Sequence, residues 1–398
     1  MLMSPKDGSS SPAPVFVLCF PDAVRVAGQT IQGRVELDLA RAQDDGVEDV
    51  RVILEGSIVT TIIESNSDGS DTKHQRTVHL IDSTQSLWQR GAAFPAPGSH
   101  ILPLPFEFTL PDNLPPSFTF SLPQQQAQIS YTIEIVGSRR GLLRKDRRVR
   151  KTFAVLPAAS PAQLEAKTSL KQGWNGPWKA TVLEQKLRPG IWGDYAHARV
   201  EVKTPNMASF PRATAVPLKI AIETRTKPMS RTDTPFDKAR KPLFPAPPTE
   251  PSDVKLHLHR EAHIRTQRRS ETGNDCIRTL GSLGDTSAKR VASPPEWIPD
   301  LEKPDRGVWK RTVQFETSLS LPYAPTFSTE TLECKYFLRF TVPFPSRNDL
   351  QLHVPIHLDP AHACPPPDNI NYAFIPPEDP PPLHEFPPSY LTAIDQTN

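Results

Sequence analysis

Apolar side chains alternate with polar ones along several stretches of this chain, and this period of two limits its fold more than any other feature. From Ile31 to Leu39 the odd-numbered positions are apolar or glycine, and the positions between them are polar or charged. Such alternation indicates β-strands with one buried and one wetted face. Two further rows before residue 150 follow the same rule: Val50, Val52, Leu54, Gly56 and Ile58, then Ile129, Tyr131, Ile133 and Ile135. Helical periodicity is nearly absent, so the strands must cover each other's apolar faces, which predicts a two-sheet sandwich.

A second series of alternating rows begins near Trp178, after the break from Pro157 to Pro161. Its clearest rows start at Val216, Val254, Val313, Cys334 and Leu350. This series predicts a second sandwich, and Pro355 places the last strand at a sheet edge because proline lacks the N–H that an inner strand needs.

The 398 residues are enough for two domains of ordinary size, each with its own core. Only 37% of the residues are hydrophobic and 46 are prolines, so much of the chain should be loop or tail. We therefore predict an all-β protein with two immunoglobulin-like sandwiches in tandem. The expected segments are a disordered leader (1–14), a first sandwich (15–157), a linker (158–177), a second sandwich (178–358) with mobile inserts at about 225–252 and 265–304, and a Pro-rich disordered tail (359–398).

The net charge of +2 argues against a general nucleic-acid binder, which needs a broad basic face. The four cysteines are scattered without short spacings, and this favours a reducing cytosol. No run of about 18 apolar residues occurs, so we expect no membrane span.

Catalytic motifs with the right context are missing: there is no G-x-S-x-G, P-loop, H-E-x-x-H or paired C-x-x-C. The chain is therefore expected not to be an enzyme and to need no cofactor. His257, His259, Glu261 and His263 would share one strand face, and alternate histidines can bind zinc. Since Leu256 and Leu258 take the buried face, we expect these histidines on the wetted face and predict no metal site.

Three stretches resemble the arrestin family. The segment from Val24 to Leu37 is similar to the family's entry into its first sandwich. More specific is the run from Leu104 to Phe118, with Pro-Phe-Glu-Phe-Thr-Leu-Pro followed by Leu-Pro-Pro-Ser-Phe, and then Tyr131. The basic run from Arg139 to Lys151 looks like the family's hairpin before its closing strand. The second domain matches more weakly, and the long inserts look most like the alpha-arrestins, the trafficking adaptors found in fungi.

The tail contains Pro387-Pro388-Ser389-Tyr390, a PPxY sequence of the kind that WW domains bind. Trafficking adaptors of the arrestin family use this motif to recruit HECT-type ubiquitin ligases, so the resemblance assigns that role to Pro387, Pro388 and Tyr390. Chance is the competing explanation, because a tail with this many prolines can produce the motif by composition alone.

Eight of the thirteen residues from Arg139 to Lys151 are basic: Arg139, Arg140, Arg144, Lys145, Arg147, Arg148, Arg150 and Lys151. Such a hairpin would attract acidic phospholipids or phosphorylated cargo tails, although charge runs are often only solvated faces.

The resemblance implies an adaptor that binds the cytosolic tails of membrane transporters or receptors, recruits a HECT-type ligase, and promotes ubiquitination and endocytosis. It would be cytoplasmic and peripherally associated with the plasma membrane or endosomes. The alternative is a structural sorting subunit of an endosomal coat, which shares the architecture but needs no PPxY motif.

Overall fold

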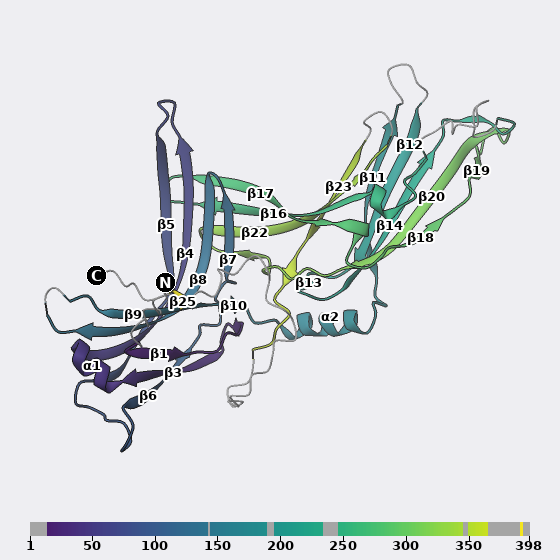
Figure 1. Ribbon diagram of the computed structural model, residues 1–398. Helices are drawn as coiled ribbons and strands as arrows, with labels where there is room; N and C mark the ends of the chain where they lie inside the picture. Colours follow the sequence, from purple (N-terminus) through teal and green to yellow (C-terminus); the bar gives the residue numbers. More distant parts are fainter. Residues whose placement is uncertain are drawn as a thin grey trace, which may run out of the picture.

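The computed structural model describes residues 14–141, 144–188, 195–233, 246–344 and 349–364, and the backbone of residues 391–392. Figure 1 shows two groups of strands, an N-terminal lobe in purple and blue and a C-terminal lobe in teal to yellow. Strands dominate the described part of the chain and helices are few and short. The predicted all-β class with two sandwich domains in tandem is therefore confirmed.

The N-terminal lobe contains two main sheets, a short parallel pair and one helix. The first sheet has the order β1-β3-β6, with β1 (Phe16–Cys19), β3 (Thr30–Asp38) and β6 (Ile101–Thr109). The second has the order β25-β9-β8-β4-β5, with β25 (Leu391–Thr392), β9 (Arg147–Phe153), β8 (Gln125–Arg139), β4 (Val47–Ser65) and β5 (Asp71–Gln89), and β7 (Phe118–Leu122) also pairs with β8. The parallel pair joins β2 (Arg25–Val26) to β10 (Val155–Leu156), and helix α1 (Leu39–Asp45) connects β3 to β4.

The alternating rows lie where the sequence predicts them. Val50, Val52 and Leu54 of β4 are buried, as are Ile129, Ile133 and Ile135 of β8. Tyr131 is buried among them, and its hydroxyl donates a hydrogen bond to the Pro115 carbonyl at 2.7 Å. Two hydrogen bonds fix the neighbouring Ser117: its backbone N–H donates to the Val155 carbonyl at 2.8 Å, and its hydroxyl accepts from the Val155 N–H at 3.0 Å. The Leu-Pro-Pro-Ser-Phe run is thus part of the core.

The C-terminal lobe is built from two main sheets. The seven-stranded sheet runs β11-β12-β14-β20-β15, with β11 (Trp178–Leu187), β12 (Ala196–Pro205), β14 (Val216–Arg225), β20 (Arg306–Leu319) and β15 (Met229–Ser230), while β18 (Lys289–Ala292) and β19 (Glu296–Pro299) also pair with β20. The five-stranded sheet runs β17-β16-β22-β21, with β17 (Ser270–Leu280), β16 (Lys255–Arg265), β22 (Leu332–Val342) and β21 (Phe327–Ser328), and β23 (Leu350–Ile356) also pairs with β22. A parallel pair, β13 (Phe210–Pro211) and β24 (Leu358–Asp359), and two short turns of 3₁₀ helix, η1 (Pro251–Asp253) and η2 (Gly281–Leu283), complete the lobe. Among the described strands β23 pairs only with β22, which confirms the edge position predicted from Pro355.

Helix α2 (Pro161–Lys171) lies in the segment expected to link the domains. Its start is a capping box: Ser160 and Gln163 bond reciprocally to each other's backbone N–H, and Pro161 occupies the first turn. The sequence Ser-Pro-Ala-Gln carries this signal.

The expectation of a mobile insert over residues 265–304 is wrong. Strand β17 pairs along β16, and β18 and β19 both pair with β20. These strands lie at sheet edges and bury few side chains, so their polar composition resembles that of a loop. In the other predicted insert, β15 and η1 are ordered, and residues 234–245 lie outside the described part of the chain.

The predicted tail also begins too early. Residues 359–364 are described, and Asp359 and Ala361 are buried. The Asp359 carboxylate accepts hydrogen bonds from the Ser209 hydroxyl at 3.0 Å and the Ala361 N–H at 3.1 Å. These bonds hold the chain beyond β23 against the C-terminal lobe.

Candidate functional site

The basic hairpin joins the end of β8 to the start of β9, and a single carboxylate holds its two sides together. Asp45, the last residue of α1, lies 2.7 Å from Arg139 Nη2 and 2.6 Å from Arg147 Nε. The Asp45 backbone carbonyl also accepts a hydrogen bond from Arg139 Nε at 2.9 Å. Asp45 therefore cross-links both strands of the hairpin to the helix.

The helix places this carboxylate accurately. Asp38 caps the start of α1 by accepting the Arg41 N–H at 3.2 Å, and Gly46 ends it with a φ of 72°, in the left-handed region that glycine adopts without strain. A negative charge at a helix C-terminus is unfavourable by itself, so the arginines compensate for it. The hydrogen bond from Arg147 and the charges of Arg147, Arg139 and Arg144 lower the pKa of Asp45 below its usual value.

The strand β9 carries three more basic side chains that pair within the lobe. Arg148 lies 3.1 Å from Glu134 and 3.8 Å from Asp146, Arg150 lies 2.9 Å from Glu55, and Lys151 lies 2.7 Å from Asp22. The hairpin thus brings eight cations beside five carboxylates, which leaves a local charge of 8 − 5 = +3.

The excess charge lies at the tip. Arg140, Arg144 and Lys145 are exposed, and no ion pair to a carboxylate is present for them among the described residues. Arg144 does bond to the Asp45 backbone carbonyl at 3.5 Å. The tip is therefore the part of the hairpin best able to meet an anionic partner, and the β9 residues serve mainly to hold the strand in place.

The PPxY residues Pro387, Pro388 and Tyr390 lie outside the described residues. Their role remains a prediction from the sequence.

The histidine row of β16 differs in part from the prediction. His257 and His263 are partly exposed, as expected, but His259 is buried with 6% of its surface exposed. Its ring stacks on Phe337 of the neighbouring strand, with centroids 5.0 Å apart and planes 6° apart. A large aromatic partner on the wetted face therefore buries a histidine that alternation alone places in water. Within the described ranges, no group of three or more His, Cys, Asp or Glu side chains is arranged to hold a metal ion.

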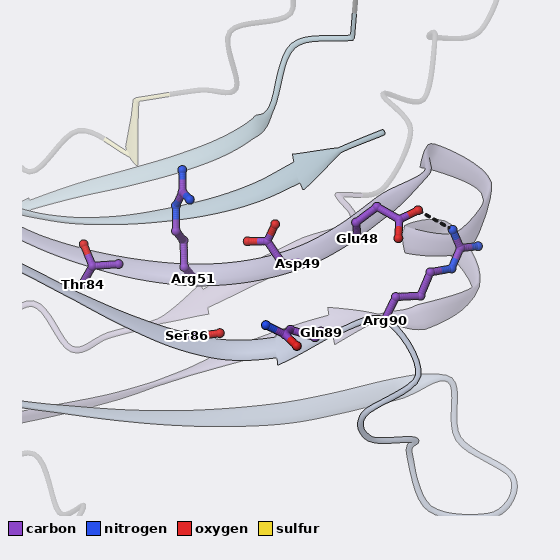
Figure 2. A pocket seen from close by; sticks show the side chains of 7 residues that line it. All are labelled: Glu48, Asp49, Arg51, Thr84, Ser86, Gln89 and Arg90. Carbon is purple, nitrogen blue, oxygen red and sulfur yellow. Dashed lines mark hydrogen bonds and ion pairs between the residues drawn. The ribbon is translucent and has the colours of Figure 1, made fainter. Parts of the chain in front are cut away.

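A shallow polar pocket lies between β4 and β5 near the ends of the strands (Figure 2). Its volume is about 450 Å³, and Glu48 and Arg90 form a 2.8 Å ion pair at one side. The lining residues are Glu48, Asp49, Arg51, Thr84, Ser86, Gln89 and Arg90. This lining includes hydroxyls and the carboxylates of Glu48 and Asp49, and the Glu48 carboxylate is already paired with Arg90.

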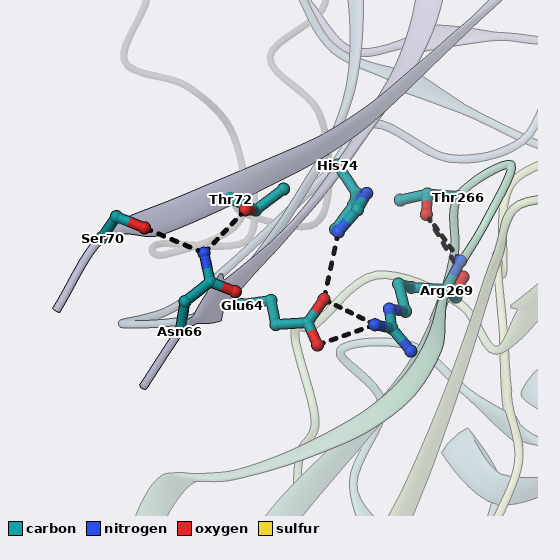
Figure 3. A network of polar contacts seen from close by, with 7 residues as sticks. All are labelled: Glu64, Asn66, Ser70, Thr72, His74, Thr266 and Arg269. Carbon is teal, nitrogen blue, oxygen red and sulfur yellow. Dashed lines mark hydrogen bonds and ion pairs between the residues drawn. The ribbon is translucent and has the colours of Figure 1, made fainter. Parts of the chain in front are cut away.

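The contact between the lobes is a polar site that sequence reasoning missed. Figure 3 shows Arg269, from the turn after β16, pointing at Glu64 near the end of β4. Arg269 Nη2 lies 2.7 Å from both Glu64 carboxylate oxygens, and His74 Nε2 lies 3.3 Å from one of them. The buried Thr60 hydroxyl donates to the Arg265 carbonyl at 3.0 Å. The far end of the β4–β5 hairpin thus docks on the C-terminal lobe.

A buried arginine forms the centre of this contact. Arg260 of β16 lies over the rings of Phe118 and Phe120 from the N-terminal lobe, 5.1 and 5.2 Å from their centroids. Its Nη2 lies 2.7 Å from Asp275, and its Nη1 donates to the Thr119 carbonyl at 3.0 Å. Phe118 also meets Phe327 of the C-terminal lobe edge to face, with centroids 5.1 Å apart. This packing joins the aromatic end of the Leu-Pro-Pro-Ser-Phe run to the second sandwich.

The described chain thus consists of two all-β sandwiches that meet through a polar and aromatic interface, and the first of them carries the basic hairpin. Residues 16–160 match the family model described as "Arrestin (or S-antigen), N-terminal domain". The match supports the arrestin family for this chain, and the fold is an arrestin-type two-domain β-sandwich. Proteins of this family are generally adaptors without enzymatic activity. No curated protein matches the chain significantly. None of the described helices has the length and apolar character needed to cross a membrane.

Proposed function

We propose that this chain is an adaptor of the alpha-arrestin type, which binds membrane-protein cargo and recruits a HECT-type ubiquitin ligase through Pro387, Pro388 and Tyr390. The observation that carries the proposal is the arrestin N-terminal domain over residues 16–160 in a chain that also contains a PPxY sequence. Binding of the tail to the ligase raises the ligase concentration near the cargo, so a weak peptide contact is sufficient for ubiquitination and endocytosis. The adaptor acts in the cytoplasm, at the plasma membrane or endosomes.

Cargo tails or acidic phospholipids are the proposed ligands of the basic hairpin. The exposed tip residues Arg140, Arg144 and Lys145 support this role, because each charge near an anionic surface contributes roughly 1 kcal/mol. Arg147 and Arg139 hold Asp45 and are poor choices for a test, since reversing their charge would also break the hairpin.

The ligase arm is tested by a pull-down of purified WW domains with the full chain. Tyr390→Ala should abolish capture, because the tyrosine ring fills one of the two pockets of a WW domain. Pro376→Ala is the matched control: it changes a proline pair in the same tail that no tyrosine follows at the required spacing. Capture that survives Tyr390→Ala would exclude ligase recruitment by this motif and favour the structural sorting subunit instead.

The hairpin arm is tested by co-sedimentation with anionic vesicles and with phosphorylated cargo-tail peptides at low salt. Arg140→Glu with Lys145→Glu should weaken binding, whereas Arg199→Glu on β12, which is paired with Glu201 at 2.8 Å, should not. If both variants bound equally well, the hairpin would be a solvated face without a role in binding.

A further inference from the structure

The outer face of the five-stranded sheet carries a row of basic and imidazole side chains that the adaptor proposal does not use. His257 on β16 is the cross-strand partner of Arg339 on β22, and Arg339 is the partner of His353 on β23. The residues beside them in sequence, including Leu256, Leu338 and Val354, are buried on the opposite face. Since partners in register point the same way with Cβ atoms about 5 Å apart, the three side chains stand next to each other on the wetted face.

Arg339, on the central strand of the three, is the positively charged member of the row. Among the residues that the structure describes it forms no ion pair, and its Nε is buried without a hydrogen-bond partner. The carboxylates that share this face, Glu261 and Glu333, are both beside Lys335. Glu333 lies 2.8 Å from its Nζ, and the hydrogen bond to Glu333 together with the charges of Glu333 and Glu261 raises the pKa of Lys335. Arg339 is therefore a partly exposed guanidinium with no carboxylate paired to it among the described residues, and an anion at this face would supply the missing charge.

A second side chain beside the row is also unsatisfied. His259 Nδ1 lies 3.0 Å from Asn274 Oδ1, and an amide oxygen only accepts, so Nδ1 carries the hydrogen. The other ring nitrogen, Nε2, is buried without a partner. His259 occupies the position next to His257 on the same strand face, with ring centroids 6.2 Å apart. In this tautomer Nε2 is an acceptor, so the His259 ring lies beside the row without offering a donor to an anion.

We infer that Arg339, His257 and His353, with Lys255 at the margin, form a binding site for a phosphate monoester. A guanidinium offers paired N–H donors that match phosphate geometry, and flanking imidazoles add donors when they are protonated. The same phosphate chemistry occurs on soluble phosphorylated molecules and on phosphorylated lipid head groups. This site is separate from the basic hairpin and does not depend on the proposed ligase recruitment.

Binding at this site is linked to pH through His257. In the free protein, burial and the charges of Arg339, His259 and Lys255 lower its pKa below 6.5. The other groups that face it are the Thr279 hydroxyl at 3.1 Å and the Cys276 sulfur at 3.7 Å, and neither is a carboxylate. A bound dianion favours the imidazolium, so affinity increases as the pH falls toward 6 and decreases again once the phosphate, with a second pKa of about 6, takes up its own proton.

The test titrates the full chain with glycerol 3-phosphate at pH 6 and at pH 7.5. Binding is followed through the imidazole proton resonances of His257 and His353. We expect both resonances to shift with the probe at pH 6, and Arg339→Gln to weaken binding by about tenfold or more. Arg339→Lys, which keeps the charge without the paired donors, should bind with intermediate strength. His257→Gln should flatten the pH dependence. Arg199→Gln on β12, whose guanidinium is paired with Glu201 at 2.8 Å, is the control and should leave binding of this probe unchanged.

A second arm distinguishes the source of the phosphate. Binding of the full chain to vesicles with and without phosphatidylinositol 4-phosphate is compared. If a lipid head group is the ligand, Arg339→Gln removes the increase in vesicle binding that this lipid causes. If the ligand is a soluble molecule, Arg339→Gln weakens only the binding of glycerol 3-phosphate. The inference is overturned if the probe shifts neither histidine at pH 6, or if Arg339→Gln, shown to be folded by its melting temperature, binds as well as the unchanged chain. Either result is independent of the WW-domain capture that tests the proposed function.

Discussion

The guanidinium of Arg269 in the C-terminal lobe holds the carboxylate of Glu64 in the N-terminal lobe, with one nitrogen 2.7 Å from both carboxylate oxygens. These residues are 205 positions apart in the chain. The ion pair therefore reports directly on whether the end of the β4–β5 hairpin remains docked on the second sandwich.

Replacement of Glu64 by Gln should lower the melting temperature at pH 7, and this difference should shrink as the pH falls below 4.5. The hydrogen bonds from Arg269 and His74 lower the pKa of Glu64 below 4.5. A carboxylate whose pKa is depressed in the folded state stabilises that state above its unfolded pKa and loses this contribution as the pH falls through the folded pKa. Thermal unfolding measured from pH 7 to pH 3 checks the prediction. A difference between the two proteins that stays constant over this range would contradict it.

Replacement of Asp45 by Asn should change stability and ligand binding in opposite directions. Weakening the three charge-assisted hydrogen bonds that Asp45 accepts from Arg139 and Arg147 should reduce the free energy of unfolding by about 1–3 kcal/mol, measured by urea denaturation. Because the pKa of Asp45 is lowered, this stabilisation is present above pH 3.8 and disappears as the pH falls through the lower folded value. The same change removes one negative charge from the hairpin, so binding to anionic vesicles should become stronger.

Asp146→Asn is the matched control for Asp45. Its carboxylate lies 3.8 Å from Arg148, a partly exposed pair that should contribute less than about 1 kcal/mol. Equal loss of stability in the two variants would mean that Asp45 is not the residue that fixes the hairpin.

Replacement of Tyr131 by Phe tests the link between the Leu-Pro-Pro-Ser-Phe run and the core. Burial raises the pKa of this tyrosine well above its usual value, so its hydroxyl stays protonated and donates to the Pro115 carbonyl at 2.7 Å. Loss of that hydrogen bond should cost about 1 kcal/mol of unfolding free energy in urea denaturation, since the ring still fills its place. A loss above about 3 kcal/mol would show that the ring itself has moved.

Alternation predicted the central strands well because burial on one face leaves a clear record in the sequence. The rows that include Val50, Ile129, Val216 and Phe340 all became strands with those side chains in the core. Strand β17 escaped prediction because it pairs at a sheet edge and buries little beyond Gly273 and Leu280. Its backbone pairs with β16, and such pairing does not require apolar side chains at alternate positions. The sequence of β17 therefore lacks the alternation from which a strand can be predicted.

The site was predictable only where its residues are consecutive. The basic run from Arg139 to Lys151 could be found as a charge cluster, but Asp45, which pairs with it across 94 and 102 positions, could not. The same limit applies to Arg260, whose partners Thr119 and Phe118 come from the other lobe. Pairs of this kind depend on how the lobes dock, and a single sequence does not record that arrangement.

Replacement of Arg260 by Met should be the most destabilising of these changes, at about 3–5 kcal/mol in chemical denaturation, because it leaves Asp275 as an uncompensated charge in the lobe interface. Arg260→Met combined with Asp275→Asn should recover part of this loss, since no unpaired carboxylate remains. Arg199→Met, which breaks a more exposed pair on β12, should cost no more than about 1 kcal/mol. If Arg260→Met behaved like Arg199→Met, the aromatic contact of Phe118 with Phe327 would be sufficient to dock the lobes, and the buried ion pair would have no part in holding them together.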